Sequence, residues 1–426
     1  MLFKYCNKIM VLIGTSTHFN SISYFYRNRM FMKLTEHVKK EVEANLSRII
    51  EIRRHLHENP ELSFKEYETS KFIQQTLDLW NISYTSGYVD TGIVAKISSG
   101  NSDKTFALRA DIDALPIQEE NETCYTSKNS GVMHACGHDA HTASVLGTLK
   151  ILNENKDLWS GEVTAVFQPG EEQLPGGAKL MIEAGALNHN PDYILGQHVY
   201  PDLESGKVGF KSGQYMASCD EIHLEITGNG GHGALPHQSD DVILIASQLL
   251  ISLQQVVSRK ISPYTPCVLS FGYIFANGET NILPNSVKLK GTFRCMDEHW
   301  REVAHKEITK ITNGVVEGLN GKANLDIRKG YPSLINNKEI TEFSKNRAIE
   351  FLGKENVVDL DLRMTAEDFA YYSQMMPACF YRFGTAQKGK VSDKKLHHPK
   401  FDIDEEKALR TAVGVMAYTT LSYLKK

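Results

Sequence analysis

Histidines and a cysteine are concentrated in one short stretch of the chain, residues 133–141, which reads MHACGHDAH. It contains three of the 16 histidines of the sequence, His134, His138 and His141, together with Cys136. Thiolate and imidazole are ligands that borderline transition metals prefer in proteins. Cys136 and His138 stand two residues apart, so an extended backbone would project both side chains to one side. The stretch therefore predicts a metal site, with a nucleophilic Cys–His pair or a buried cysteine beside structural histidines as the alternatives.

Two adjacent acidic residues, Glu171 and Glu172, follow the apolar segment 162–167 and a Gln-Pro-Gly turn. In a turning chain, two neighbouring carboxylates cannot both point at one atom, so one could bind a metal while the other moves a proton. Open α/β folds form their sites at the carboxyl ends of the strands. This position favours a functional pair over a solvated acidic turn.

Further imidazoles stand beside other predicted elements. His198 directly follows the apolar segment 192–197, at the expected end of a strand, and His397 and His398 precede the last predicted helix. Taken alone, such histidines are more often structural or surface residues than ligands. Nothing local in the sequence decides between those roles and metal binding.

The spacing of apolar residues predicts an α/β domain. Helical spacing covers residues 34–59, 66–79, 143–153 and 178–184, and short β-rich segments cover residues 91–97, 105–110, 162–167 and 192–197. Strands that alternate with helices indicate a sheet that has helices on both faces. We therefore expect a mixed sheet between helices.

The pattern changes after about residue 216. The predicted order becomes strand, helix, strand, strand, helix, strand, at residues 222–226, 240–259, 267–275, 286–296, 298–318 and 323–329. This order is the ferredoxin-like α+β pattern, and it predicts a compact second domain over residues 217–330. Helix and strand patterns then resume and end in a helix over residues 403–424, so the second domain interrupts a first domain formed by residues 33–216 and 331–426.

Composition excludes several classes of protein. Apolar residues make up 41% of the 426 residues, and the formal net charge is −4. A polytopic membrane protein, a collagen and a disordered chain are excluded, and no basic field attracts nucleic acid or a membrane surface. Seven cysteines without a CxxC pair favour a reducing compartment, the cytoplasm. Residues 1–32 are expected to be an N-terminal extension without a fold, with a transit-type leader or a later start at Met30 or Met32 as the alternatives.

Nine segments, in this order along the chain, resemble the M20 metallopeptidase family and within it the amidohydrolase branch of aminoacylases, hippurate hydrolases, indole-acetyl-amino-acid hydrolases and N-acetyl-diaminopimelate deacetylases. The segments are RRHLHENPELSFKEYETS (53–70), RADIDALPI (109–117), MHACGHDAHTA (133–143), FQPGEE (167–172), GQHV (196–199), GNGGHGALPH (228–237), NILPNSVKLKGTFR (281–294), TAEDFA (365–370) and LHHPKF (396–401). The resemblance covers nearly the whole chain from about residue 34 onward. It implies a metal-dependent hydrolase domain interrupted by a ferredoxin-like satellite domain.

The resemblance also implies a metal site. Five positions match the ligands of two divalent ions, Zn, Mn, Co or Ni, that share the cysteine thiolate: Cys136, His138, Glu172, His198 and His397. His398 is the alternative to His397, because it stands where the branch usually has serine.

Other residues acquire roles through the same resemblance. Glu171 matches the general base, and His232 matches a satellite-domain histidine that contacts the carbonyl oxygen of the substrate. Arg294 and Asn281 match substrate contacts, with Arg294 suited to bidentate capture of a carboxylate. The groups that hold imidazoles and metal ligands in place are Asp139, His141 and Glu367.

The activity implied is hydrolysis of a small N-acyl amino acid to a carboxylate and a free amino acid. The resemblance further implies a homodimer formed through the satellite domain, in which His232 reaches the site of the partner chain. Three alternatives stay open. They are a metallo-carboxypeptidase or dipeptidase on the same site, a covalent hydrolase that uses Cys136 and His138, and a binding protein without catalysis.

Overall fold

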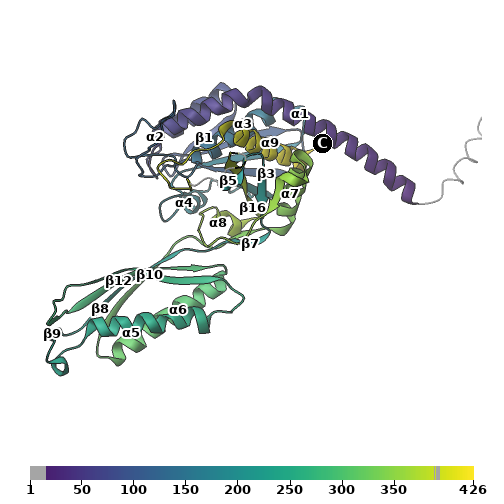
Figure 1. Ribbon diagram of the computed structural model, residues 1–426. Coiled ribbons are helices and arrows are strands. Elements are labelled where there is room, and N and C mark those ends of the chain that lie inside the picture. The colour runs from purple at the N-terminus through teal and green to yellow at the C-terminus, as the bar shows by residue number, and fades with distance from the viewer. Residues whose placement is uncertain (1–15, 388, 390–393) are drawn as a thin grey trace, which may run out of the picture.

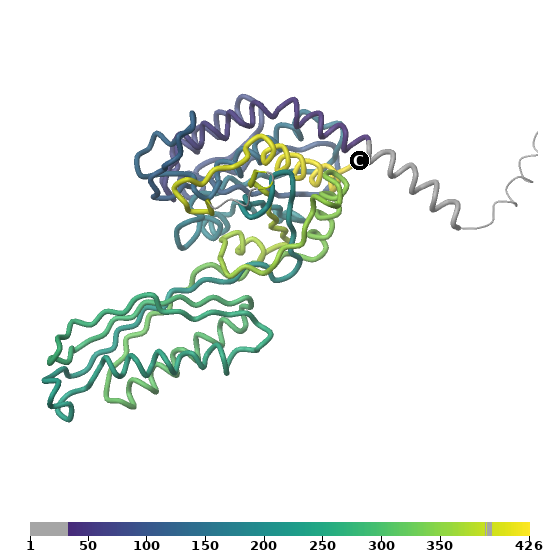
Figure 2. The backbone as a smooth tube through the Cα atoms, viewed as in Figure 1, coloured from purple at the N-terminus to yellow at the C-terminus, as the bar shows by residue number. Residues whose placement is uncertain are grey.

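The computed structural model describes residues 16–387, 389 and 394–426, with side chains described from residue 33 onward. The described residues form a larger and a smaller body (Figure 1). The chain passes into the smaller body and returns along neighbouring paths (Figure 2). Residues 1–15 of the expected N-terminal extension lie outside the described residues, whereas residues 16–32 form the first part of helix α1 (Ser16–Glu58).

The larger body is built on an eight-stranded mixed sheet. In spatial order its strands are β1 (Ser83–Tyr88), β2 (Gly92–Ser99), β4 (Gly161–Gln168), β3 (Thr105–Asp111), β5 (Tyr193–Glu204), β16 (Ala378–Ala386), β6 (Val208–Phe210) and β15 (Val357–Asp359). The central strands β4, β3, β5 and β16 run parallel to one another, and β1, β2 and β6 introduce antiparallel pairs. The mixed sheet expected from the sequence is confirmed.

Helices cover both faces of this sheet, as expected. On one face lie α1, α3 (His138–Glu154), α7 (Lys338–Leu352) and α9 (Glu405–Leu424), and on the other lie α4 (Gly177–Glu183) and α8 (Ala370–Met375) (Figure 1). Helix α2 (Tyr67–Leu79) packs beside β1 and β2. Alternate side chains of β4 enter opposite cores: Val163 and Phe167 pack with α1, α3 and α9, while Val166 packs with α4 and α8. Burial on both faces explains why the central strands are almost entirely apolar.

The smaller body has a four-stranded antiparallel sheet with the spatial order β10 (Cys267–Ala276), β12 (Ser286–Cys295), β8 (Asp220–Thr227), β13 (Lys322–Lys329). Helices α5 (Val242–Gln255) and α6 (Glu298–Gly318) pack on one face, against Ile222, Leu224 and Ile226. The ferredoxin-like order of elements expected from the sequence is confirmed. Most of the helix predicted over residues 240–259 forms α5, which ends at Gln255. A π-helical turn at Val256–Lys260 follows it.

Short elements complete the two bodies. Strands β7 (Gly213–Met216) and β14 (Leu334–Asn336) pair where the chain leaves and re-enters the larger body, and β9 (Gly231–His232) pairs with β11 (Ile282–Leu283). Short 3₁₀ turns lie at Lys156–Leu158, Pro236–Gln238 and Lys354–Asn356.

A buried ion pair fixes the root of the smaller body. Arg301 of α6 binds both carboxylate oxygens of Asp220, the first residue of β8, and also donates to the main-chain oxygen of Gly330 at 3.0 Å. The imidazole of His305 lies 2.7 Å from Asp220 Oδ2, and the main-chain nitrogen of Gly330 donates to Asp220 Oδ1 at 3.2 Å. Asp220 thus joins the point where the chain enters this body to the point where it leaves.

We expect Asp220→Asn to lower the free energy of unfolding of the smaller body by about 3–5 kcal/mol, because the substitution leaves the buried Arg301 without its counter-charge. Chemical denaturation measures the loss. Asp326→Asn is the matched control, since Asp326 forms an exposed pair with Arg328 and its removal should change stability little. Equal stabilities of the two variants would contradict this role of Asp220.

Candidate metal centre

The turn at Gly137 brings Cys136 and His138 together. Gly137 has a φ of 81°, in the left-handed region, and precedes helix α3, of which His138 is the first residue. A Cβ at this glycine would lie 2.6 Å from a methyl group of Val199. The expectation that an extended backbone projects both side chains is therefore wrong: a sharp turn into a helix aligns them, and only glycine fits there.

Strand and loop positions bring the other predicted ligands to the same place. Glu172 lies in the loop after β4, as expected from the sequence. His198 lies inside β5, which continues to Glu204, so its expected position at the end of a strand is wrong. His397 has a φ of 64°, and its main-chain nitrogen donates to the oxygen of Ala135 at 2.9 Å, which places it beside the 133–141 stretch.

His398 does not join this cluster. Its Nδ1 accepts a hydrogen bond from the main-chain nitrogen of Lys400 at 3.0 Å, and the side chain is exposed. Of the two neighbouring histidines, the structure brings only His397 to Glu172, with Nε2 3.3 Å from Glu172 Oε1.

The ligand atoms form two groups that share one residue. Cys136, His138 and His198 each offer an atom, and these atoms lie within 4.8 Å of one another. The atoms of Cys136, Glu172 and His397 satisfy the same limit. Two three-ligand groups with a common cysteine are the arrangement that two divalent ions with a bridging thiolate require.

Two buried atoms in this cluster have no hydrogen-bond partner. His138 Nδ1 donates to the main-chain oxygen of Asp113 at 3.0 Å and lies 3.1 Å from its Oδ1, which leaves Nε2 facing the cluster. That Nε2 and Glu172 Oε1, 3.9 Å apart, are both buried and make no hydrogen bond. Because an unsatisfied buried polar atom is costly, these atoms fit a cation.

The chemistry of His198 and Cys136 agrees with a ligand role. His198 Nδ1 donates to the main-chain oxygen of Val199 at 2.8 Å, and its Nε2 lies 3.5 Å from Cys136 Sγ. Burial and the neighbouring Arg382 hold the pKa of His198 well below its usual value, so the imidazole is neutral. Burial and Glu172 raise the pKa of the Cys136 thiol well above its usual value, which disfavours an unassisted nucleophilic cysteine.

Aspartates of the segment 109–117 orient the ligands, although sequence analysis assigned them no role. Asp113 accepts from His138, from the main-chain nitrogen of Glu172 at 3.0 Å and from the Ser63 hydroxyl at 2.7 Å. Burial alone would raise its pKa, but these hydrogen bonds and the His138 charge lower it. Asp113 therefore holds one ligand from each group.

Asp111 and Arg109 support the ligand cluster through buried hydrogen bonds and an ion pair. Asp111 Oδ1 lies 2.6 Å from His141 Nδ1, and His141 Nε2 accepts from the main-chain nitrogen of Val199 at 2.9 Å. Burial would raise the pKa of Asp111, but Arg109, His138 and His141 hold it well below its usual value. His141 thus positions strand β5 beside His198 through the main chain of Val199, and not through a hydrogen bond to the side chain of a predicted metal ligand. The signal that could have found these residues is an arginine and an aspartate inside an apolar strand, followed two residues later by a second aspartate.

The two other residues predicted to support the ligands, Asp139 and Glu367, lie in different surroundings. Asp139 accepts from Arg53 Nε at 2.7 Å and lies 2.7 Å from His57 Nδ1, so it ties α3 to α1 and holds the imidazole of His57, which is not one of the predicted metal ligands. Glu367 lies 3.0 Å from Arg109 Nη2 and lines the cavity over the ligand cluster.

Glu171 is the buried carboxylate beside the ligands. Burial raises its pKa well above the usual value, and the neighbouring charges of Glu367 and Glu172 add to the effect. Its main-chain oxygen accepts from the Tyr331 hydroxyl at 2.5 Å, which fixes the backbone. With Cys136 and His397 it lines a cavity of about 510 Å³, where it can take up a proton.

Three predicted residues lie elsewhere. His232, on β9, and Asn281, beside β11, lie at the end of the smaller body away from the larger one (Figure 1). Arg294 lines a separate cavity of about 650 Å³ with Cys219 and Tyr273. Within one chain the structure does not bring these residues to the ligand cluster.

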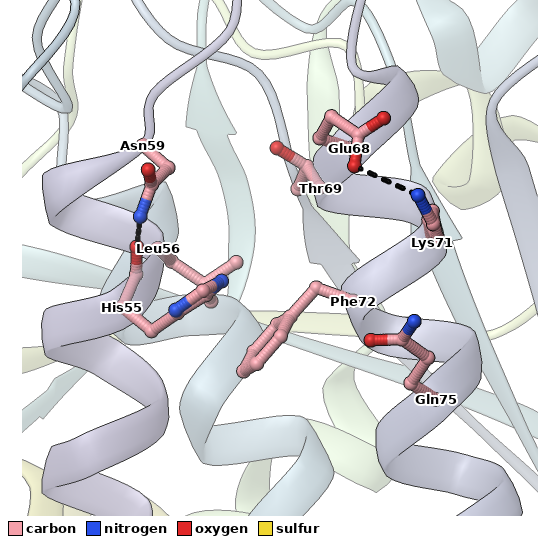
Figure 3. Close-up of a pocket in the computed structure, with 8 residues that line it drawn as sticks. All are labelled: His55, Leu56, Asn59, Glu68, Thr69, Lys71, Phe72 and Gln75. Carbon is pink, nitrogen blue, oxygen red and sulfur yellow. Dashed lines mark hydrogen bonds and ion pairs between the residues drawn. The ribbon is translucent and has the colours of Figure 1, made fainter.

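A smaller cavity of about 280 Å³ lies between α1 and α2 (Figure 3). His55 and Phe72 line it and stack with ring centroids 3.9 Å apart, and Asn59, Glu68 and Lys71 also line it. None of the ligand groups described above reaches it.

The chain is similar in sequence and in structure to known metallopeptidases and amidohydrolases. The model of peptidase family M20/M25/M40 matches residues 107–422. The chain is 40% identical over 364 residues to N-acetyl-L-cysteine deacetylase of Bacillus subtilis, covering 85% of each chain. It is 38% identical over 397 residues to thermostable carboxypeptidase 2 of Saccharolobus solfataricus, covering 92% of this chain and 98% of the relative. The crystal structure of the Bacillus subtilis YXEP protein, a dinuclear metal-binding peptidase from the M20 family, superposes with a TM-score of 0.76 at 34% identity, covering 90% and 99% of the chains.

We expect Glu172→Gln to lose bound metal and Glu171→Gln to retain it. A neutral amide is a weaker ligand than the Glu172 carboxylate, whereas Glu171 belongs to neither of the two cysteine-sharing groups. Metal analysis after dialysis distinguishes them, and each variant is the matched control for the other. If Glu171→Gln is the variant that empties the site, the two assignments are reversed.

Proposed function

The chain belongs to peptidase family M20/M25/M40, and from this premise we propose that it hydrolyses the amide bond of N-acyl amino acids, releasing a carboxylic acid and a free amino acid. The observation that carries the proposal is that two ligand groups share Cys136. Glu171 lines the same cavity as this cysteine. The similar deacetylase supports N-acyl amino acids as the substrate class.

Each residue of the cluster has a task in this proposal. Cys136, His138 and His198 would hold one divalent ion, and Cys136, Glu172 and His397 would hold the second. When bound, two such ions lower the pKa of a shared water towards neutrality and polarise the scissile carbonyl.

Glu171 moves the proton. The carboxylate takes a proton from the water whose oxygen attacks the carbonyl carbon, and returns it to the nitrogen as the carbon–nitrogen bond breaks. The raised pKa of this buried carboxyl suits the first step, because a group of higher pKa accepts a proton more readily. The products are a carboxylate and an amine.

A metallo-carboxypeptidase is the second candidate, and the similar carboxypeptidase favours it. Both activities cleave an amide next to an amino acid that carries a free carboxylate, and they differ in the group on the acyl side. A panel of N-acyl amino acids and dipeptides, tested with metal-reconstituted protein, separates them. Higher kcat/KM on the N-acyl compounds supports the first proposal, and preference for dipeptides supports the second.

We further propose that the chain forms a homodimer through the smaller body, which we assign to residues 217–330, leaving residues 33–216 and 331–426 as the catalytic domain. Strand β10 is an edge of its sheet, and Ile274 and Phe275 on it are more than half exposed. On α5, Ile251 is 75% exposed. An unpaired strand edge beside exposed apolar side chains is a surface suited to a second copy.

Among the described residues, the segment Val242–Lys260 alone is long and apolar enough, by length and composition, to cross a membrane. Its buried face packs on β8 and β12, which explains part of its apolar character. The exposed remainder fits the dimer surface. We propose a cytoplasmic enzyme of small molecules without a nucleic-acid or membrane partner, supported by the net charge of −4 and by the free thiols of the described cysteines.

We expect Cys136→Ser to bind metal more weakly and to lose activity that excess metal partly restores, because an alcohol is a poorer ligand than a thiolate. Activity assayed across a metal titration measures this. Full activity of the wild-type protein after removal of metal by a chelator would contradict the two-metal proposal and favour covalent catalysis.

Mixing two inactive variants tests the dimer and the role of His232. Glu171→Gln should lose about 10² to 10⁴ in rate, and His232→Ala should also be nearly inactive. Re-annealed in equal amounts, about half of the dimers are heterodimers, and one of their two sites has both residues intact if His232 acts on the partner. The mixture should then recover about a quarter of wild-type activity.

No recovery, with heterodimers shown to be present, would contradict the shared site. His232 would then act within its own chain or only as a turn residue.

A further inference from the structure

Arg363 is a cation in the active-site cavity that has no anion to bind. It lines the same cavity of about 510 Å³ as Cys136, Glu171 and His397. Its side chain makes no hydrogen bond or ion pair with any residue that the structure describes, and its Nε is buried without a partner. A buried guanidinium nitrogen without an acceptor is unfavourable unless a ligand supplies one.

The other cations of this cavity are occupied. Arg382 donates to the Tyr215 hydroxyl at 2.9 Å and to the main-chain oxygen of Val199 at 3.3 Å. Lys395 forms an ion pair with Asp202. Among the described cations that line the cavity, Arg363 is therefore the one available to a ligand.

The structure holds Arg363 in place without satisfying its charge. Its guanidinium lies over the ring of Tyr200, with the carbon 5.0 Å from the ring centroid. Its main-chain nitrogen donates to Tyr215 at 2.9 Å, and its main-chain oxygen accepts from Ala217 at 3.0 Å. Both partners belong to the segment that leads from the larger to the smaller body.

We propose that Arg363 determines substrate specificity by binding the carboxylate of the amino-acid half of the substrate. The proposal rests on the proposed N-acyl amino acid hydrolysis. The α-carboxylate of such a substrate lies two bonds from the scissile nitrogen, so it must bind in the cavity that contains the ligand cluster. A planar guanidinium with free donors suits bidentate capture of that group.

This assignment differs from the one that resemblance gives. Arg294, which matches a carboxylate-binding position, lines the other cavity on the smaller body. Arg363 comes from the larger body itself and needs no contribution from a second body or chain. The amino-acid half of the substrate then points towards the segment that joins the two bodies, and the acyl half points away from it.

The test compares a substrate with its uncharged analogue. For wild-type protein and Arg363→Met, kcat/KM is measured on an N-acetyl amino acid and on the matching N-acetyl amino acid amide, in which a carboxamide replaces the carboxylate. We expect Arg363→Met to lose about 10- to 100-fold on the acid and to change less than about threefold on the amide, the scale of a hydrogen bond to a charged group. Arg363→Lys, which keeps the charge without the planar fork, should lose less on the acid.

Lys395→Met is the matched control, because Asp202 already neutralises this lysine; its ratio of acid to amide activity should equal that of the wild type. Equal losses of Arg363→Met on acid and amide would overturn the proposal and assign Arg363 a structural role. Loss of the preference in Arg294→Met but not in Arg363→Met would overturn it in favour of Arg294. If the wild type hydrolyses no N-acyl amino acid, the proposed function fails rather than this assignment alone.

Discussion

Unsatisfied ligand atoms that converge on one cysteine are the constraint on which the rest of the site depends. Bringing imidazole, carboxylate and thiol groups within 4.8 Å of one another, with Cys136, His138 and His198 buried, is unfavourable unless a cation joins them. The fold accepts this arrangement through one sharp turn: Gly137 in the left-handed region lets Cys136 end a loop and His138 begin a helix. The methyl groups of Val199 occupy the space that any larger residue would need.

Hydrogen bonds around the cluster orient two of its imidazoles towards the centre. Asp113 accepts the Nδ1 proton of His138, and the main chain of Val199 accepts that of His198, so both histidines present Nε2 to the cluster. Arg109 compensates the acidic side, with Nη1 2.6 Å from Asp111 and Nη2 2.7 Å from Asp368. One buried arginine on the central strand β3 thus permits several carboxylates to lie close to Glu171.

Local patterns predicted much of the fold and the identity of the cluster. Strand β3 and helix α6 begin and end close to their expected positions, because alternation and helical spacing report burial directly. The unusual density of histidine at residues 133–141 marked the site. Its geometry was not predictable: residues 136–138 form a turn rather than an extended segment, and β5 runs beyond His198 because it pairs with β16, which comes 174 residues or more later in the chain.

Residues whose role depends on distant partners also escaped prediction. Asp113 and Arg109 act through hydrogen bonds to side chains of other elements, and Arg363 is distinguished by the absence of such partners among the described residues. None of these contacts between distant elements produces a periodic pattern in the sequence. That His232 and Arg294 belong to the smaller body, by contrast, follows from the ferredoxin-like order of its elements. Only the three-dimensional arrangement shows that both residues lie away from the ligand cluster of their own chain.

Titration of the metal-free protein with Co²⁺ tests most directly whether two ions share the thiolate of Cys136. Thiolate ligation to cobalt produces charge-transfer absorption, which imidazole and carboxylate ligands do not. If the two ions share this thiolate, two ions bind per chain, the absorption grows during both equivalents, and it is absent in Cys136→Ala. Absorption that stops growing after the first equivalent, or that persists in Cys136→Ala, would contradict a shared cysteine.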